Sequence, residues 1–388
     1  MAKPAGARCN LACRYCYYIE KRGLYPGDNG TMDDSLLELF TRQYIDAQTG
    51  RETLFTWHGG EPLLLPLSFY RRALSLQRRY GRGRTTDNCI QTNGTLLTNE
   101  WGAFLADNNF LVGVSIDGPK EMHDTLRGKT FDRVMDGIRK LDARHVQWNA
   151  MATVNKMNVG DPTAFYKFFK SIGCKYIQFT PVVERTDDSG RLLSGTDEGG
   201  TLTEASITPE QWGAFLCGLF DEWIKTDVGE VFVQLFDAVL ACWAGVPPGI
   251  CSLAPTCGHV AALEHNGDVY SCDHFVFPEY KLGNIRRETL TAMMYSSRQM
   301  LFGKRKSGSL PRQCRECAYL FTCHGECPKN RFARDRYGER GLNFLCDGYR
   351  TFFAHVTPYM DFMKDELAAG RAPANVMGAV FPTKTGNG

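Results

Sequence analysis

Apolar and polar residues alternate between residues 52 and 181 in a pattern that predicts repeated strand–helix units. Short apolar runs are expected to form strands, at residues 53–57, 89–92, 111–116, 147–154 and 176–180. Amphipathic stretches with helical spacing follow, at residues 67–80, 100–106, 131–143 and 163–171. Such repeats predict an α/β fold with a parallel sheet, whose ligands bind at the C-terminal ends of the strands.

The pattern changes near residue 229, where the alternation is expected to stop and cysteines become frequent. We therefore predict three parts: a barrel-like domain over residues 1–229, a cysteine-rich domain over 230–350, and a C-terminal helix with a tail over 351–388. Residues 184–206 are expected to form a partly mobile surface loop, and the tail after about residue 368 is expected to be frayed. A first strand at residues 1–4 would be unusually short or trimmed. His265-Asn266-Gly267 predicts a hairpin turn between residues 261–264 and 268–271.

Composition and charge narrow the class of protein. The chain has 388 residues, more than one average domain of about 150, and a formal net charge of +2. This charge gives no reason to expect a nucleic acid or an acidic membrane as partner. We find no apolar run that could span a bilayer and no signal peptide, so we expect a cytoplasmic protein. The 15 cysteines then indicate metal binding or catalysis rather than disulfides.

Three of these cysteines, Cys9, Cys13 and Cys16, have the spacing C-x3-C-x2-C, with Tyr15 just before the last. Three thiolates can hold three irons of a [4Fe–4S] cluster and leave the fourth iron open to a substrate. The alternative is a zinc knuckle, but zinc sites usually use four ligands and no fourth lies nearby. The triplet therefore predicts an iron–sulfur cluster with an open site.

Polar residues follow several predicted strands. Gly59-Gly60-Glu61 ends the first, Gln91 and Asn93 end the next, and Ser115 closes the one after. Glycines allow a ligand to approach the backbone, whose exposed polar groups can bind it. The alternative is ordinary turn chemistry, because Asn-Gly and Asp-Gly are common turn formers.

Eight cysteines gather in the second half, enough for two fully ligated iron–sulfur clusters. They are Cys251, Cys257, Cys272, Cys314, Cys317, Cys323, Cys327 and Cys346. Zinc ribbons are the alternative for these pairs.

The triplet and its aromatic neighbour resemble the signature of radical S-adenosylmethionine (SAM) enzymes, and the second half resembles their SPASM extension. The resemblance implies a partial (β/α)6 barrel followed by a SPASM domain, with three [4Fe–4S] clusters and SAM as cofactors. Gly59, Gly60 and Glu61 would hold the SAM amino group, and Ser115 and Arg127 its carboxylate, with Gln91 and Asn93 nearby. The first auxiliary cluster would be bound by Cys251, Cys257, Cys272 and Cys327, and the second by Cys314, Cys317, Cys323 and Cys346.

The stretches CDHFVFPEYKLGNI, MAKPAGARCNLACRYCYYIEK, WHGGEP and QTNG resemble one family in particular, the anaerobic sulfatase-maturating enzymes. That resemblance implies oxidation of a cysteine or serine of a sulfatase to Cα-formylglycine. His58 departs from the family pattern, because some members carry Gln there. Other SPASM enzymes crosslink peptides with the same clusters, so peptide crosslinking is the alternative activity. A ferredoxin-like carrier or a zinc-bound interaction module would explain only the second domain.

The resemblance also implies roles within the site. Asp273 would be the base that takes the proton of the target, and burial is expected to raise its pKa toward a better match. A structural Asp or the neighbouring His274 is the alternative. Tyr18 would line the active site near the target side chain, although a core tyrosine fits its position nearly as well.

The expected partners follow from the same resemblance. They are an unfolded or nascent sulfatase with a Cys/Ser-x-Pro/Ala-x-Arg motif and an electron donor such as flavodoxin or ferredoxin. The sequence does not distinguish a serine target from a cysteine target.

Overall fold

The computed structural model describes residues 1–195, 197 and 199–380. The chain divides into two compact units, and each is described by itself. Unit 1 comprises Met1–Ile116, His123–Asn149 and Gly258–Lys304, and unit 2 comprises Asp117–Met122, Ala150–Cys257 and Arg305–Gly388. Within the described residues, no helix is both long and apolar enough to cross a membrane.

Unit 1 is built on a sheet with the strand order β12-β11-β10-β1-β2-β3-β4. The strands are β1 (Ala2–Lys3), β2 (Glu52–Trp57), β3 (Thr85–Thr92), β4 (Leu111–Ser115), β10 (Ala262–Glu264), β11 (Asp268–Tyr270) and β12 (Lys281–Asn284). Neighbouring strands from β10 through β1 to β4 are parallel, whereas β10, β11 and β12 run antiparallel. The C-terminal ends of β1 to β4 therefore meet at one edge of this sheet, where ligands of parallel sheets bind.

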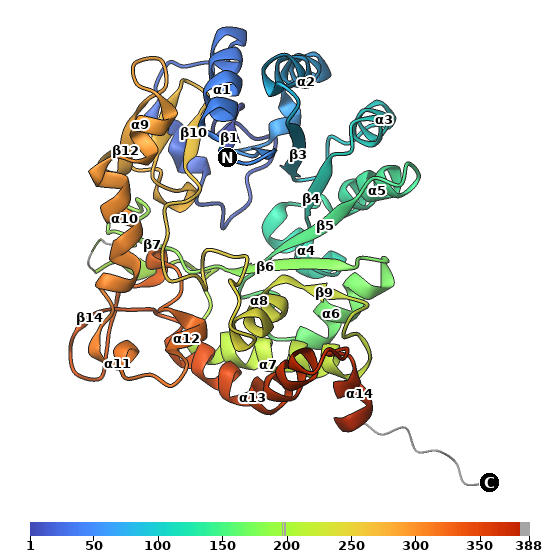
Figure 1. Cartoon of the computed structure of the whole chain (residues 1–388), viewed down its shortest axis with the longest axis vertical. Helices are drawn as coiled ribbons and strands as arrows, with labels where there is room; N and C mark the ends of the chain where they lie inside the picture. The colour runs from blue at the N-terminus through green and yellow to red at the C-terminus, as the bar shows by residue number, and fades with distance from the viewer. Residues whose placement is uncertain (196, 198, 381–388) are drawn as a thin grey trace. The chain divides into compact units, whose positions relative to one another are not determined.

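Helices cover this sheet, and Figure 1 shows α2, α3 and α5 on the same side of β3 and β4. The helices that lie mainly in unit 1 are α1 (Asp34–Ala47), α2 (Leu67–Gly81), α3 (Asn99–Asp107), α4 (Lys120–Arg127), α5 (Phe131–Asp142), α9 (Leu290–Met294) and α10 (Ser297–Gly308). Side-chain caps help to fix the residues at which these helices begin. The Asp33 carboxylate accepts a hydrogen bond of 2.7 Å from the backbone N–H of Leu36, which caps α1.

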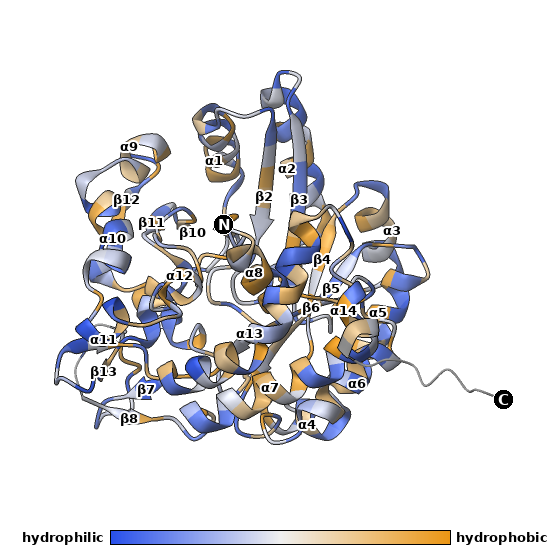
Figure 2. Ribbon diagram, turned by 60° about the horizontal axis from the view of Figure 1, so that its bottom comes forward, coloured by the Kyte–Doolittle hydropathy of each residue, from blue (hydrophilic) through white to orange (hydrophobic). Residues whose placement is uncertain are grey.

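Unit 2 contains the parallel strands β5 (Trp148–Val154, mostly in this unit), β6 (Tyr176–Pro181) and β9 (Phe232–Val233). Its helices are α6 (Pro162–Ser171), α7 (Pro209–Thr226), α8 (Gln234–Trp243), α11 (Arg312–Arg315), α12 (Leu320–Cys323), α13 (Cys346–Ala368) and α14 (Asn375–Val380). A capping box between Thr208 and Gln211 starts α7. Trp212, Phe215 and Phe236 are fully buried, and Figure 2 shows the orange, hydrophobic residues of α8.

The sequence predicted the repeated strand–helix units and the hairpin at His265 correctly. The structure differs from the prediction in the bounds of some elements and in where the strand–helix alternation ends. β3 begins at Thr85, four residues before the predicted strand at residue 89. Strand β9 and helix α8 continue the alternation beyond residue 229. The predicted first strand is present as β1, with two residues.

The loop predicted over residues 184–206 is more ordered than expected. It forms an antiparallel pair, β7 (Arg185–Thr186) and β8 (Thr201–Leu202), and the Arg185 side chain is buried within it. Its guanidinium donates hydrogen bonds to the backbone carbonyls of Ser194 and Asp197, at 3.1 and 3.0 Å. The tail predicted to be frayed includes α14, and residues 196, 198 and 381–388 lie outside the described residues.

Candidate active site

The loop with the cysteine triplet follows β1 in unit 1. Its three thiols are partly exposed and none forms a disulfide. The backbone N–H of Cys16 donates to the carbonyl of Cys13 at 3.1 Å, and the N–H of Leu11 donates to Sγ of Cys9 at 3.4 Å. Burial raises the pKa of the Cys9 thiol, so a bound metal is needed to hold it as a thiolate.

The glycine turn after β2 lies directly against this loop. The N–H of Gly60 donates to the carbonyl of Gly6 at 2.8 Å, and the N–H of Glu61 donates to the carbonyl of Arg8 at 2.7 Å. A Cβ at Gly60 would lie 1.9 Å from the Arg8 carbonyl oxygen, so only glycine fits. We expected exposed backbone groups here, but the N–H groups are used inside the chain. Only carbonyl oxygens of the turn can therefore face a ligand, which suits an ammonium group.

The Glu61 carboxylate is also used inside the chain. It is fully buried and accepts hydrogen bonds from the N–H of Leu63, the hydroxyl of Thr92 and the N–H of Asn93, at 2.9, 2.8 and 2.7 Å. Burial raises its pKa to about 7. In this structure the Glu61 side chain links the ends of β2 and β3, so any contact of this residue with SAM would come from its backbone.

The other predicted SAM residues lie at the same edge of the unit 1 sheet. Asn93 donates to Sγ of Cys9 at 3.7 Å and to Oδ1 of Asn10 at 2.9 Å, which ties β3 to the cysteine loop. Gln91 donates to the Ser115 hydroxyl at 3.1 Å. The buried Arg127 guanidinium lies 5.3 Å from the centre of the Tyr15 ring, within the cysteine triplet. Asn93 and Arg127 thus contact the cysteine loop, whereas Gln91 and Ser115 contact each other.

Asp273 lies in a short 3-10 helix after β11 and forms an ion pair with the fully buried Lys3 of β1. The Tyr17 hydroxyl donates a hydrogen bond of 2.6 Å to Oδ2 of Asp273. Burial is the largest single influence on the pKa of the Asp273 carboxyl and raises it. The combined lowering by Lys3, His58 and His274 is larger, so the pKa lies below its usual range. We expected the opposite direction, because the sequence did not reveal that Lys3 would be the partner.

His58 stands beside this ion pair at the end of β2. Burial and the nearby Lys3 charge lower its pKa to about 4, so the ring is neutral at physiological pH. The N–H of Gly59 donates to Nδ1 of His58 at 2.7 Å, so the proton of the neutral ring is on Nε2. His274, the alternative base, has its ring 5.3 Å from that of Tyr17.

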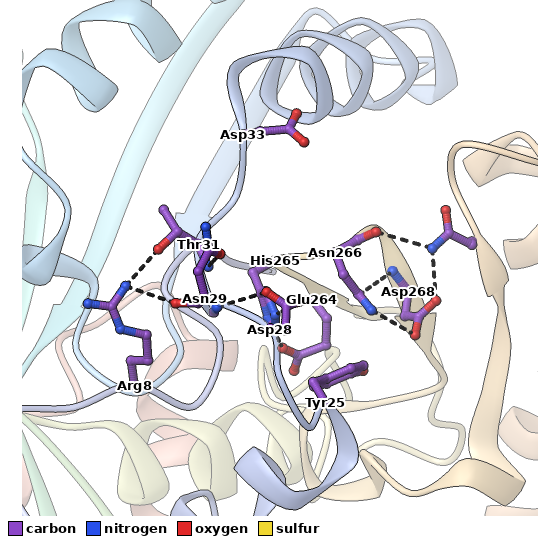
Figure 3. A network of polar contacts seen from close by, with 12 residues as sticks. Arg8, Tyr25, Asp28, Asn29, Thr31, Asp33, Glu264, His265, Asn266 and Asp268 are labelled. Atoms are coloured by element: carbon purple, nitrogen blue, oxygen red, sulfur yellow. Dashed lines mark hydrogen bonds and ion pairs between the residues drawn. The ribbon is translucent and has the colours of Figure 1, made fainter.

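The Tyr18 hydroxyl is turned into the core of unit 1. It hydrogen-bonds the buried Glu264 carboxylate, while the Lys3 ammonium lies 3.7 Å from the centre of its ring. The Glu264 carboxylate lies 3.4 Å from Nδ1 of His265, and Nε2 of the same ring lies 3.1 Å from the exposed Asp28 carboxylate. Figure 3 shows the Glu264, His265 and Asp28 side chains next to one another. This placement favours a core role for Tyr18 over direct contact with the target.

Sequence reasoning missed Lys3, Tyr17 and Glu264. A lysine in a two-residue strand leaves no periodic pattern, and Tyr17 and Tyr18 differ only in which way a loop turns them. One feature pointed to Lys3: it is the charged residue of the otherwise apolar stretch MAKPAG before the triplet.

In unit 2, the four cysteines predicted to bind the second auxiliary cluster surround one cavity. Its volume is about 150 Å³, and its lining includes Cys314, Cys317, Cys323 and Cys346. Burial raises the pKa of Cys323 and Cys346, the latter to about 12, so the thiols need a metal to be ionised. The arrangement fits a cluster with four thiolate ligands.

The predicted first auxiliary set is divided between the units, with Cys272 in unit 1 and Cys251, Cys257 and Cys327 in unit 2. Within unit 2, Lys306 interacts electrostatically with Cys257 and Cys327. Across the described residues, no three His, Cys, Asp or Glu side chains converge as they would on a single metal ion.

Comparisons with known proteins agree with this geometry. Residues 4–169 match the Radical SAM superfamily, and residues 256–318 match SPASM, an iron–sulfur cluster-binding domain. The chain is a radical SAM enzyme with a SPASM domain, as the sequence predicted, and these domains imply iron–sulfur clusters and SAM as cofactors.

The similarity to individual proteins is more specific. A serine-type anaerobic sulfatase-maturating enzyme of Bacteroides thetaiotaomicron is 59% identical, over 98% of this chain and 94% of that one. A serine-type enzyme of Klebsiella aerogenes is 36% identical, over 94% of this chain and 87% of that one. The solved structure of native anSMEcpe with bound AdoMet has a TM-score of 0.84 and 29% identity, over 94% of this chain and 98% of that one. The chain belongs to the family of anaerobic sulfatase-maturating enzymes.

Proposed function

We propose that this enzyme oxidises a serine of a sulfatase to Cα-formylglycine, and that it accepts cysteine less well. The observation that carries the proposal is the placement of the candidate base: Tyr17, which follows the cluster cysteine Cys16, hydrogen-bonds Asp273 directly. The candidate proton acceptor is thus hydrogen-bonded to the residue that directly follows a cysteine of the triplet. The serine preference rests on the serine-type relatives, at 59% and 36% identity.

The open iron and SAM, when bound, supply the radical that removes a hydrogen atom from Cβ of the target. Asp273 then accepts the proton of the target hydroxyl at a carboxylate oxygen, and one further electron must leave the target carbon to give the aldehyde, for which the auxiliary clusters, when bound, would be the acceptor. Lys3 keeps this carboxylate ionised, and its ammonium also favours negative charge that develops on the substrate oxygen. His58, with its proton on Nε2, offers a hydrogen-bond donor that orients the target, as a Gln at this position also does.

We propose the remaining site roles on the same basis. The turn at Gly59 and Gly60 binds the SAM amino group through carbonyl oxygens, held in shape by Glu61. Four further residues line the SAM site, namely Gln91, Asn93, Ser115 and Arg127. Three clusters are bound by the triplet and by the two auxiliary sets described above.

The polypeptide partner is an unfolded or nascent sulfatase that carries the Cys/Ser-x-Pro/Ala-x-Arg motif. A second partner, of the flavodoxin or ferredoxin kind, donates the electron. Three exposed arginines lie within or beside the triplet, Arg8, Arg14 and Arg22, and their charge suits such acidic carriers. Nη2 of Arg22 donates to the carbonyl of Cys9 at 3.2 Å, which places this charge beside the cluster loop. We infer that the reaction runs in the cytoplasm, where thiols and clusters stay reduced.

The test is an anaerobic assay with reconstituted enzyme, SAM, a strong reductant and two motif peptides that differ only in Ser or Cys at the target. We expect an aldehyde-bearing peptide in step with 5′-deoxyadenosine, formed faster from the serine peptide. Cys13→Ala abolishes both products, while the matched control Cys217→Ala, a thiol outside the proposed ligand sets, leaves them unchanged. If 5′-deoxyadenosine forms while both peptides stay intact, the sulfatase substrate is wrong and another peptide modification is favoured.

A further inference from the structure

Two cations are buried among the cysteine-bearing segments of unit 2. Lys306 is 1% exposed and Arg331 is 8% exposed. Because an isolated buried charge is strongly unfavourable, each cation needs negative or strongly polar partners in the interior. Their partners therefore indicate what the two residues do.

The Arg331 guanidinium is bound to the loop that joins Cys323 to Cys327. Its Nε donates to the carbonyl of the middle loop residue at 2.7 Å, and its Nη2 donates to the carbonyls on either side at 2.6 and 3.0 Å. The loop consists of residues 324–326, so every residue between the two cysteines is held by one side chain.

The backbone of this loop is unusual. His324, Gly325 and Glu326 all have positive φ, at 47°, 71° and 53°. For residues with a Cβ this conformation is unfavourable and persists only where the surroundings impose it. A Cβ at Gly325 would lie 2.4 Å from Cδ2 of Leu310 and 2.6 Å from Nη2 of Arg331, so a larger residue there would displace the guanidinium. The charge-assisted hydrogen bonds of Arg331 offset the strain, because this conformation presents three carbonyls to the guanidinium.

Lys306 connects the same guanidinium to a third cysteine segment. Its ammonium donates to the backbone carbonyl of Cys251 and, at 2.7 Å, to that of Ser252. Nη1 of Arg331 donates to the carbonyl of Lys306 at 2.6 Å. The two cations thus join the Cys251 segment to the Cys323–Cys327 loop.

The two side chains also act on the thiols through charge. Lys306 interacts electrostatically with Cys257 and Cys327, and Arg331 interacts with Cys314, Cys323 and Cys327. We assign these cysteines to both auxiliary clusters. Glu326 contributes one negative charge against the two positive charges, and thiolates would supply the remainder.

We propose that Arg331 and Lys306 are positioning residues shared by the two auxiliary clusters: they hold the cysteine loops in place and raise the reduction potentials of the clusters. A buried positive charge stabilises the reduced cluster, which carries one more negative charge, relative to the oxidised one. The clusters thereby become better acceptors for the electron that leaves the substrate. This inference rests on the proposed cluster sites of unit 2.

The test measures potentials directly. In a background where Cys9, Cys13 and Cys16 are replaced by Ala, only the auxiliary clusters remain, and iron analysis should give about eight irons per chain. A redox titration followed by electron paramagnetic resonance then compares Arg331→Met, Arg331→Lys and Lys306→Met with this background. We expect Arg331→Met and Lys306→Met to shift the one-electron equilibrium at least tenfold against reduction, or about 59 mV. Arg331→Lys, which keeps the charge, should stay within threefold.

Arg305→Met is the matched control, because it removes an exposed charge from the residue next to Lys306 and should leave potentials and iron unchanged. Full iron with potentials within threefold of the background in both Met variants would overturn the inference. If Arg331→Met loses iron, Lys306→Met provides the potential test. Loss of iron in both, with iron retained in Arg331→Lys and Arg305→Met, supports the holding role, whereas loss in the control too would overturn it. A background without about eight irons refutes the proposed cluster sites themselves.

Discussion

The two units bury positive charge in different ways. In unit 1, the fully buried Lys3 pairs with the carboxylate of Asp273, so the polypeptide itself supplies both charges. In unit 2, Lys306 and Arg331 donate to backbone carbonyls and lie near thiols. The first region is electrostatically complete as a polypeptide, whereas the second needs the thiolates of bound clusters. The charges of the Lys3–Asp273 pair are thus balanced without a cofactor, while the buried cations of the electron-transfer region are balanced only by bound clusters.

The largest expected effect is on catalysis in unit 1. Asp273→Asn keeps the shape but cannot accept the proton, so peptide oxidation should fall by about 10²–10⁴-fold. Formation of 5′-deoxyadenosine should persist, because it does not need this carboxylate. The assay follows both products by mass spectrometry and chromatography, with the exposed Asp28→Asn as control. Turnover near that of the wild type would show that Asp273 is not the base.

The next effect concerns stability and separates the two units. Lys3→Met leaves the Asp273 carboxylate buried without its cation, which should cost about 3–5 kcal/mol in free energy of unfolding. Since both charges belong to the chain, denaturant titration should show this loss with and without clusters. Arg331→Met should instead destabilise the loaded protein more than the cluster-free protein. Equal losses for Arg331→Met in both states would remove the contrast between the units.

The Lys3–Asp273 pair also makes a prediction about acid. The pKa of Asp273 is lowered in the folded state, so its contribution to stability is present above the unfolded pKa of about 3.9 and is lost as pH falls below it. In Lys3→Met the largest opposing charge is lost and burial raises this pKa. Where the pKa exceeds the unfolded value, the folded state binds the proton more readily, so the contribution of Asp273 to stability should rise as pH falls toward about 3.9, the opposite of the wild type. Denaturant titrations of both proteins at neutral and acidic pH measure the difference.

The smallest effect comes from the neutral histidine beside that pair. Burial lowers the pKa of His58 to about 4, below the unfolded value of about 6.5. Between these values only the unfolded state binds the proton, so stability falls as pH drops from 6.5 to 4. Because the ring is partly exposed, we expect a loss of about 1–3 kcal/mol, and His58→Gln should remove it. Denaturant titrations of cluster-free protein at pH 7 and pH 5 measure the difference, and equal losses in both proteins would contradict a neutral His58.

Predictions from the sequence were reliable where a residue pattern repeats. They failed where a single long-range contact determines the orientation of a side chain. The pattern of strands such as that predicted at residues 53–57 and the turn at Asn266-Gly267 gave the unit 1 sheet and its hairpin. The loop CNLACRYCYY has no period, so its residues could not show that Tyr17 faces Asp273 while Tyr18 faces Glu264. The cysteine groups came from a resemblance to known enzymes.

Arg331 illustrates a deeper limit. Its partners are backbone carbonyls, which every residue has, so no sequence motif indicates the contact. The same holds for Lys3, whose partner lies 270 residues later in the chain, because an ion pair across that separation leaves no local pattern. Features of this kind become visible only when the fold brings distant segments together.

The contact between Gly60 and the Arg8 carbonyl has a consequence for the order in which the enzyme matures. The amide protons of Gly60 and Glu61 are bonded to the backbone of the segment that leads into the cysteine triplet. Hydrogen exchange at these two amides therefore reports how firmly that segment is seated. Iron insertion should slow their exchange before any nucleoside cofactor is added, so the glycine turn would acquire its rigid shape from the metal rather than from its own ligand.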